Sequence, residues 1–155
     1  MIAPARFIYR PMPNATMTRF GYPDTLIHEY NNWVVLLRES QVTLGSLVLC
    51  AKSEATAFSE LSRNAFHEME SVVGDIEQSL TNLFHYNKIN YLMLMMVDPN
   101  VHFHVFPRYD TRRSACGLTL EDAGWPALPQ LANHHALTPI ECVALRDEIK
   151  NAWRA

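Results

Sequence analysis

Six apolar residues recur along one stretch of the chain at spacings of 3, 4, 3, 4 and 3, which places them on a single helical stripe. They are Phe66, Met69, Val73, Ile76, Leu80 and Leu83. Ser62 precedes the stretch and is a residue type that caps helix N-termini. The pattern therefore predicts an amphipathic helix of about 20 residues whose stripe packs into a core.

Before this helix come two apolar runs that are typical of β-strands. They cover residues 33–37 and 46–51. Gly45 sits at the entry of the second run, where a tight backbone turn favours a residue without Cβ. We expect a hairpin-like pair of strands joined by residues 38–44.

Two further strands are predicted after the helix. Residues 90–97 are apolar on both alternating faces, which is typical of a strand buried on both sides, and Pro99 breaks this strand. Residues 101–106 form the next strand, which Pro107 ends.

The two ends of the chain differ in character. Residues 1–23 are rich in proline and predict an irregular arm with at most one short strand, and the stretch after the last strand is loop-like as far as His135. Thr138, followed by Pro139 and Glu141, forms a capping box that predicts a helix from Pro139 to about Trp153. Together these elements predict one α+β domain over residues 1–155 with a mainly antiparallel sheet, in which 110–155 form a C-terminal extension.

Composition narrows the functional classes. The 155 residues carry a net charge of −3, which disfavours nucleic acid as a partner, since a duplex-binding protein usually carries a basic surface. Three widely spaced cysteines do not form a disulfide framework and favour a reducing compartment, so we expect a cytoplasmic location. The longest apolar run, 91–97, is far shorter than a membrane helix, and the N-terminus lacks the pattern of a secretory signal.

The segment whose residues are best suited to catalysis or ligand binding is the strand that carries the histidines. Side chains two residues apart on a strand point to the same face, so Asn100, His102 and His104 are expected to line up while Phe103 and Val105 pack into the core. Imidazoles in an apolar region need hydrogen-bond partners, so packing alone does not account for this alternation.

Three interpretations of the pair remain open on spacing alone. The histidines are structural, or they ligate zinc with Asp98, His85, His134 or His135 as further ligands, or they act in nucleophilic or acid–base catalysis. Asn100 is either part of the site or a turn residue after Asp98 and Pro99.

The run His102-Phe103-His104-Val105-Phe106-Pro107-Arg108 resembles the motif of the histidine triad (HIT) family of nucleotide hydrolases and transferases. The order of elements around it is also similar to that family, with a strand pair whose second strand opens at a glycine, a long helix and two more strands. The resemblance covers roughly residues 27–109, and it implies a HIT-like fold with one long helix and a C-terminal helix.

The resemblance implies roles for individual residues. His102 matches the nucleophile, which attacks the α-phosphorus of a nucleotide-like substrate to form a covalent intermediate, and His104 matches the histidine that holds the phosphate and the leaving group. Asn100 replaces the first histidine of the triad and cannot transfer a proton. Arg108 and Arg38 are the candidates for binding the substrate. Arg112 and Arg113 are either further phosphate ligands or residues of a solvated loop.

The resemblance also implies a homodimer, a small-molecule nucleotide as partner, and chemistry that needs neither metal nor other cofactor. Two departures accompany Asn100. The stretch before the motif is apolar, where many family members have a glycine-rich phosphate-binding stretch, and Ser46 follows Gly45, where a histidine is common. They leave a second hypothesis open, a non-catalytic nucleotide-binding protein with a degenerate triad.

Overall fold

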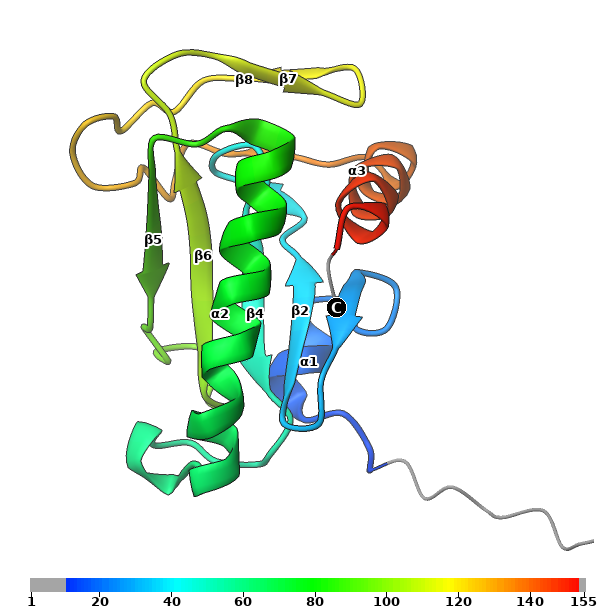
Figure 1. Cartoon of the computed structure of the whole chain (residues 1–155), viewed down its shortest axis with the longest axis vertical. Helices are drawn as coiled ribbons and strands as arrows, with labels where there is room; N and C mark the ends of the chain where they lie inside the picture. The colour runs from blue at the N-terminus through cyan, green and yellow to red at the C-terminus, as the bar shows by residue number, and fades with distance from the viewer. Residues whose placement is uncertain (1–10, 154–155) are drawn as a thin grey trace, which may run out of the picture.

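The computed structural model describes residues 11–153, and its centre is a five-stranded sheet in the order β1-β2-β4-β6-β5, in which all neighbours are antiparallel (Figure 1). The α+β class and the antiparallel sheet are therefore confirmed. The strands are β1 Leu26–Glu29, β2 Trp33–Leu37, β4 Leu47–Ala51, β5 Lys88–Leu92 and β6 His102–Arg108. The expected hairpin-like pair is present as β2 and β4, and the part of the predicted arm before Pro11 lies outside the described residues.

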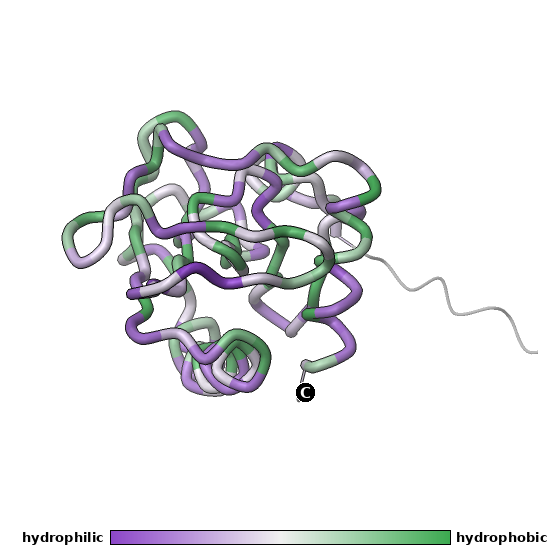
Figure 2. The backbone as a smooth tube through the Cα atoms, turned by 90° about the horizontal axis from the view of Figure 1, so that it is seen from above, coloured by the Kyte–Doolittle hydropathy of each residue, from purple (hydrophilic) through white to green (hydrophobic). Residues whose placement is uncertain are grey.

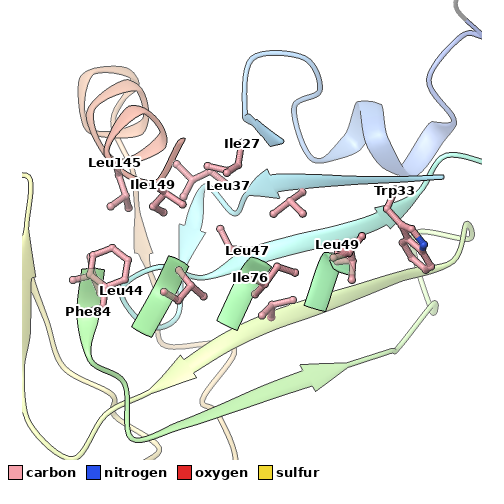
Figure 3. Packing of buried hydrophobic residues seen from close by; sticks show 14 of the residues in the cluster. Ile27, Trp33, Leu37, Leu44, Leu47, Leu49, Ile76, Phe84, Leu145 and Ile149 are labelled. Atoms are coloured by element: carbon pink, nitrogen blue, oxygen red, sulfur yellow. The ribbon is translucent and has the colours of Figure 1, made fainter. Parts of the chain in front are cut away.

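Two helices cover the same face of this sheet (Figure 2). The long helix α2, Arg63–Phe84, begins where predicted, because the Ser62 hydroxyl accepts a hydrogen bond from the backbone N–H of Ala65 at 3.0 Å. The C-terminal helix α3, Pro139–Asn151, has the expected capping box of Thr138 and Glu141. In Figure 3 the α3 side chains Leu145 and Ile149 point toward β1 and β2, next to the core residues above α2.

The buried stripe of α2 differs from the predicted one. Ile76 and Leu80 are buried as expected, and Met69 and Leu83 are partly buried against the same core. The remaining fully buried positions of the helix are Ala65, Val72, Ser79 and Phe84. Phe66 is 41% exposed and packs edge-on against Phe58 at 5.3 Å between ring centroids. The Phe66 ring thus contacts the 3-10 turn Phe58–Glu60 outside the core, and Phe66 is not part of the buried stripe of α2.

The strand bounds near the histidines also differ from the prediction. β5 ends at Leu92, so residues 93–97 are not part of a strand buried on both faces. Met95 adopts a positive φ of 47°, which turns the chain out of the extended path. Pro107 does not end β6, which continues to Arg108. Beyond Val105 the strand pairs only with β5, and a residue without an N–H is tolerated where one side has no partner strand.

The predicted arm contains a short helix, where the sequence predicted irregular chain. Asn14 caps a short helix, α1 Ala15–Arg19, by accepting a hydrogen bond from the N–H of Met17 at 2.9 Å. This helix lies against the sheet face opposite α2, where Met17 packs with a second apolar cluster of Val34, Leu36, Val48 and Cys50.

The loop-like region after β6 contains short strands that were not predicted. They are β7 Arg113–Ala115 paired with β8 Leu118–Leu120, and β9 His135–Ala136 paired with β3 Ser40–Gln41. Gly45 has a φ of 86°, and a Cβ at this position would meet the Phe84 ring at 2.9 Å, so the turn before β4 requires glycine. Within residues 11–153 no helix is long and apolar enough to span a bilayer.

Candidate active site

A cleft of about 280 Å³ opens on the sheet face opposite α2, over the histidine-bearing strand. Its walls come from the end of α1, the end of β2, strand β6 and the segment between β5 and β6. The lining residues are Arg19, Phe20, Arg38, Leu94, Met95, Met96, Val97, Asp98, His102 and His104. The structure thus brings both candidate histidines and Arg38 to one site.

His102 lies at the start of β6 and is 2% exposed. Its Nδ1 is 2.7 Å from the backbone carbonyl oxygen of Asn100. Because a carbonyl oxygen only accepts hydrogen bonds, Nδ1 is the nitrogen that carries the proton. In the neutral form of the ring, Nε2 then keeps its lone pair, which is the state a nucleophilic imidazole requires.

Asn100 is buried, but its side chain does not line the cleft. Its Oδ1 accepts hydrogen bonds from the N–H of Thr16 at 3.2 Å and from the Thr16 hydroxyl at 3.1 Å. Its own N–H donates to that hydroxyl at 3.1 Å, and its Nδ2 donates to the carbonyl of Glu54 at 3.3 Å. Asn100 is therefore fastened to α1, and it touches His102 through its backbone carbonyl.

His104 has a polar atom without a partner. Its Nδ1 is buried and forms no hydrogen bond within the described part of the chain. Burial, followed by the Coulombic influence of Arg38 and then of His102, lowers the pKa of His104 to about 4. The ring is therefore neutral near pH 7. It lies parallel to the Phe106 ring at 6.2 Å between centroids.

Arg38 brings positive charge to the same place. Its guanidinium lies over the Phe106 ring at 5.6 Å and donates to the carbonyl of Ser40. Its Nε is buried without a partner among residues 11–153. Burial lowers the pKa of Arg38 from its usual value, although an arginine stays charged at neutral pH. The Arg38 and His104 side chains both line the cleft, where a guanidinium and an imidazole are suited to the oxygens of an anion.

The rim of the cleft is formed by α1 and the segment before β6. Phe20 places its ring 5.6 Å from that of His102 and 5.5 Å from that of His104, measured between centroids. Arg19 faces Asp98 across the opening at 3.8 Å. Sequence reasoning missed Thr16, Arg19 and Phe20, because a five-residue helix is too short to show a hydrophobic period.

The structure does not bring Arg108 to the histidines. Its Nε donates to Asp122 at 2.7 Å, and its two terminal nitrogens donate to Asn90 at 2.8 Å and to the carbonyl of Ala127 at 2.9 Å. It lines a different hollow of about 630 Å³, next to Lys88 and the 125–129 segment. Its expected contact with the substrate stays a prediction.

The other candidate groups also lie away from the cleft. Arg112 forms an exposed ion pair with Glu121 at 3.5 Å, and Arg113 lies over the Tyr109 ring at 5.0 Å. Nowhere in residues 11–153 do three or more histidine, cysteine or acidic side chains gather as metal ligands. Among these described residues, the histidine pair has no third protein ligand of the kind that a zinc site uses.

Solved structures with the same architecture were found by comparison. A histidine triad protein from Sinorhizobium meliloti superimposes with a TM-score of 0.70 and 15% identity, over 90% of this chain and 95% of that one. The fold is that of the histidine triad proteins. A histidine triad protein from Marinobacter aquaeolei gives a TM-score of 0.67 and 16% identity, over 83% of this chain and 87% of that one.

A zinc-bound histidine triad family protein from Mycobacterium smegmatis also shares the HIT-like fold, with a TM-score of 0.55 and 15% identity, over 83% of this chain and 86% of that one. No family model matches the sequence, and neither does any curated protein. The likeness is therefore one of fold, and it confirms the resemblance inferred from the histidine motif at that level.

Proposed function

We propose that this chain is a HIT-type hydrolase or nucleotidyl transferase, which cleaves at the α-phosphate of a nucleotide-like substrate through a covalent histidine intermediate. The observation that carries the proposal is the hydrogen bond from His102 Nδ1 to the Asn100 carbonyl, at 2.7 Å. It leaves Nε2 unprotonated in a ring whose orientation is held.

In the proposed first step the lone pair of His102 Nε2 forms a bond to the α-phosphorus. The bond from phosphorus to the leaving group breaks, and its electron pair goes to the leaving group. Water then attacks the nucleotidyl-histidine, the phosphorus–nitrogen bond breaks, and its electron pair returns to Nε2. The proton of the water is lost to solvent. This covalent route divides one slow displacement into two easier ones.

Charge near the nucleophile supports the same proposal. Arg38 and His104 line the cleft together with His102. Phosphate oxygens accept hydrogen bonds from guanidinium and imidazole groups, and this contact stabilises charge that develops on the phosphoryl group. We assign substrate contacts in the cleft to Arg38 and His104.

Asn100 fits this scheme without transferring a proton. What His102 needs from this position is an acceptor for its Nδ1–H, and the backbone carbonyl supplies one whatever the side chain. The amide side chain instead fixes the position of that carbonyl through Thr16 and Glu54.

One observation favours the second candidate, a non-catalytic nucleotide-binding protein. The Asn100 side chain cannot donate a proton to a leaving group, and the low pKa of His104 makes it a poor acid near pH 7. A protein of this kind binds nucleotides in the cleft and releases no product.

We extend the proposal to a homodimer with a small-molecule nucleotide as its partner, as the resemblance implies, and to the cytoplasmic location that the spacing of the cysteines favours. The outer strand β5 pairs with β6 alone within the described residues, so its other edge is available to a second copy. Sedimentation of the purified chain tests the dimer.

The function is tested by turnover of adenosine and guanosine phosphoramidates and dinucleoside polyphosphates. We expect a nucleoside monophosphate to be released, and a nucleotidyl adduct on His102 to appear by mass spectrometry after rapid quenching. His102→Ala is expected to lose both, while the matched control His67→Ala, on the exposed face of α2, keeps both. Equal release by His102→Ala contradicts the mechanism, and tight nucleotide binding without any release selects the non-catalytic protein.

A further inference from the structure

One wall of the cleft is apolar and exposed. After β5 ends, the segment of residues 93–97 leaves the sheet, and its Leu94, Met96 and Val97 side chains are 46%, 86% and 87% exposed. They are three of the nine large apolar side chains that are exposed in residues 11–153. The loop joins β5 to β6 next to the start of the histidine strand (Figure 1). Apolar side chains gathered at the edge of a polar cleft mark a surface that takes an apolar ligand.

The charges in the cleft are few. Arg19 faces Asp98 at 3.8 Å, so these two opposite charges offset each other. Arg38 is the cation that remains among the lining residues, and it lies beside His104. A cleft with one uncompensated positive charge is complementary to a phosphoryl group with one ionised oxygen. A polyphosphate adds further negative charges, which would face Asp98 and the apolar wall.

We propose that the substrate of this cleft carries one singly charged phosphoryl group whose substituent is apolar and lies against Leu94, Met96 and Val97. This inference rests on the proposed function, because it places the phosphoryl group at Arg38 and His104. The unbranched thioether of Met96 adapts to different shapes, so the wall accepts apolar substituents of varied outline. The 93–97 segment is then the part of the chain that determines specificity.

The test uses three adenosine ligands that the proposed reaction does not cleave. They are adenosine 5′-phenylphosphonate, adenosine 5′-methylphosphonate and the α,β-methylene analogue of ATP. Isothermal titration calorimetry on the native chain measures each dissociation constant. We expect the phenyl ligand to bind about tenfold more tightly than the methyl ligand, because it buries an aromatic ring against the wall. We expect the triphosphate analogue to bind more weakly than the phenyl ligand.

A double variant tests whether the preference for the phenyl ligand comes from the apolar wall of the cleft. Met96→Gln with Val97→Thr changes two exposed side chains to polar ones of similar shape, so folding is expected to be unaffected. The ratio of phenyl to methyl affinity should fall about threefold or more, because the phenyl ring loses its apolar contact. Met12→Gln is the matched control, since Met12 is 85% exposed and lines a different hollow.

Several results overturn the inference. They are a triphosphate analogue that binds most tightly, no binding of any of the three ligands, or a double variant with the native ratio. A double variant that changes sedimentation and keeps the ratio assigns the wall to contact between copies of the chain instead. The native chain can also prefer the phenyl ligand and yet fail to cleave the phenyl ester of AMP. That result contradicts the hydrolase proposal but supports this inference.

Discussion

The two faces of the sheet are used in opposite ways. Under α2 and α3, the buried side chains of β2, β4 and β6 are apolar and form a continuous core. On the other face α1 covers only a small apolar cluster, and beside it the sheet opens into a cleft that Arg38, His102 and His104 line. Adjacent residues of β6 serve different faces, since Val105 packs under α2 and His104 lines the cleft. The pleat of β6 therefore directs side chains that stabilise the core to one face and side chains of the candidate site to the other.

The largest expected effect is on the cleft face. His102→Gln removes the nucleophile but keeps a polar side chain of similar size, and turnover should fall by about 1,000-fold or more. Steady-state kinetics measures the loss, and a urea titration monitors folding. Turnover within tenfold of the native value would show that His102 is not the nucleophile.

A substitution on the core face should lower stability and leave turnover nearly unchanged. Leu80 is 0% exposed within α2, and Leu80→Ala is expected to lower the free energy of unfolding by about 2–5 kcal/mol, through lost burial and a residual cavity. Turnover per folded molecule should stay within about twofold of the native value. Leu83→Ala, at a half-buried position of the same helix, is the matched control and should cost less. A Leu80→Ala variant that is fully stable but inactive would contradict the view that the core face determines stability and the cleft face determines activity.

The pH dependence of stability sharpens the comparison, because it arises on the cleft face. The pKa of His104 is lowered to about 4 in the folded chain, below the usual histidine value of about 6.5, so folding disfavours its protonated form. The neutral His104 therefore contributes its full share to the free energy of unfolding above pH 6.5. As the pH falls toward 4, the free energy of unfolding decreases by roughly 2 kcal/mol. Urea titrations at pH 7 and pH 4.5 measure it, and His104→Asn should reduce the difference. A variant with the native pH dependence assigns the effect to another group.

The smallest expected effect lies where α1 meets the histidine strand. Thr16→Val keeps the shape of the side chain but removes the hydroxyl that bonds Asn100, and kcat should fall about tenfold as the Asn100 carbonyl loses its position. Thr16→Ser restores the hydroxyl and should stay within about twofold of the native kcat. Nitrogen NMR of His102 should show a mixture of tautomers in Thr16→Val only. Identical behaviour of the two variants would reduce Thr16 to a packing role.

The features that were predictable from sequence are those set by local geometry. The alternation of residues 101–106 fixes which side chains share a face, because the period of a strand is two residues. Ser62 and Thr138 cap helices through bonds to residues three positions later, so both helix starts were correct. The phase of the α2 stripe failed at Phe66, because the ring of Phe58 offered it another contact.

The features that were missed depend on residues far apart in the chain. Thr16 and Asn100 are separated by 84 positions, and no spacing in the sequence relates them. β5 ends at Leu92, opposite His104, although β6 extends past that pair to His102, and the apolar run of residues 91–97 does not reveal this end. In the candidate site the sequence predicted His102, His104 and Arg38, which all line the cleft, and the fold adds Phe20 to them.

The position of Arg108 has a consequence for how chains of this kind diverge. Its guanidinium and the carboxylate of Asp122 are both buried, with side chains 5% and 1% exposed. Replacing one partner leaves an unpaired buried charge, at a cost of about 3–5 kcal/mol, whereas replacing both by apolar residues of similar volume avoids it. A lineage that abandons this pair must pass through a weakened intermediate, so Arg108 and Asp122 are expected to be inherited, and lost, together.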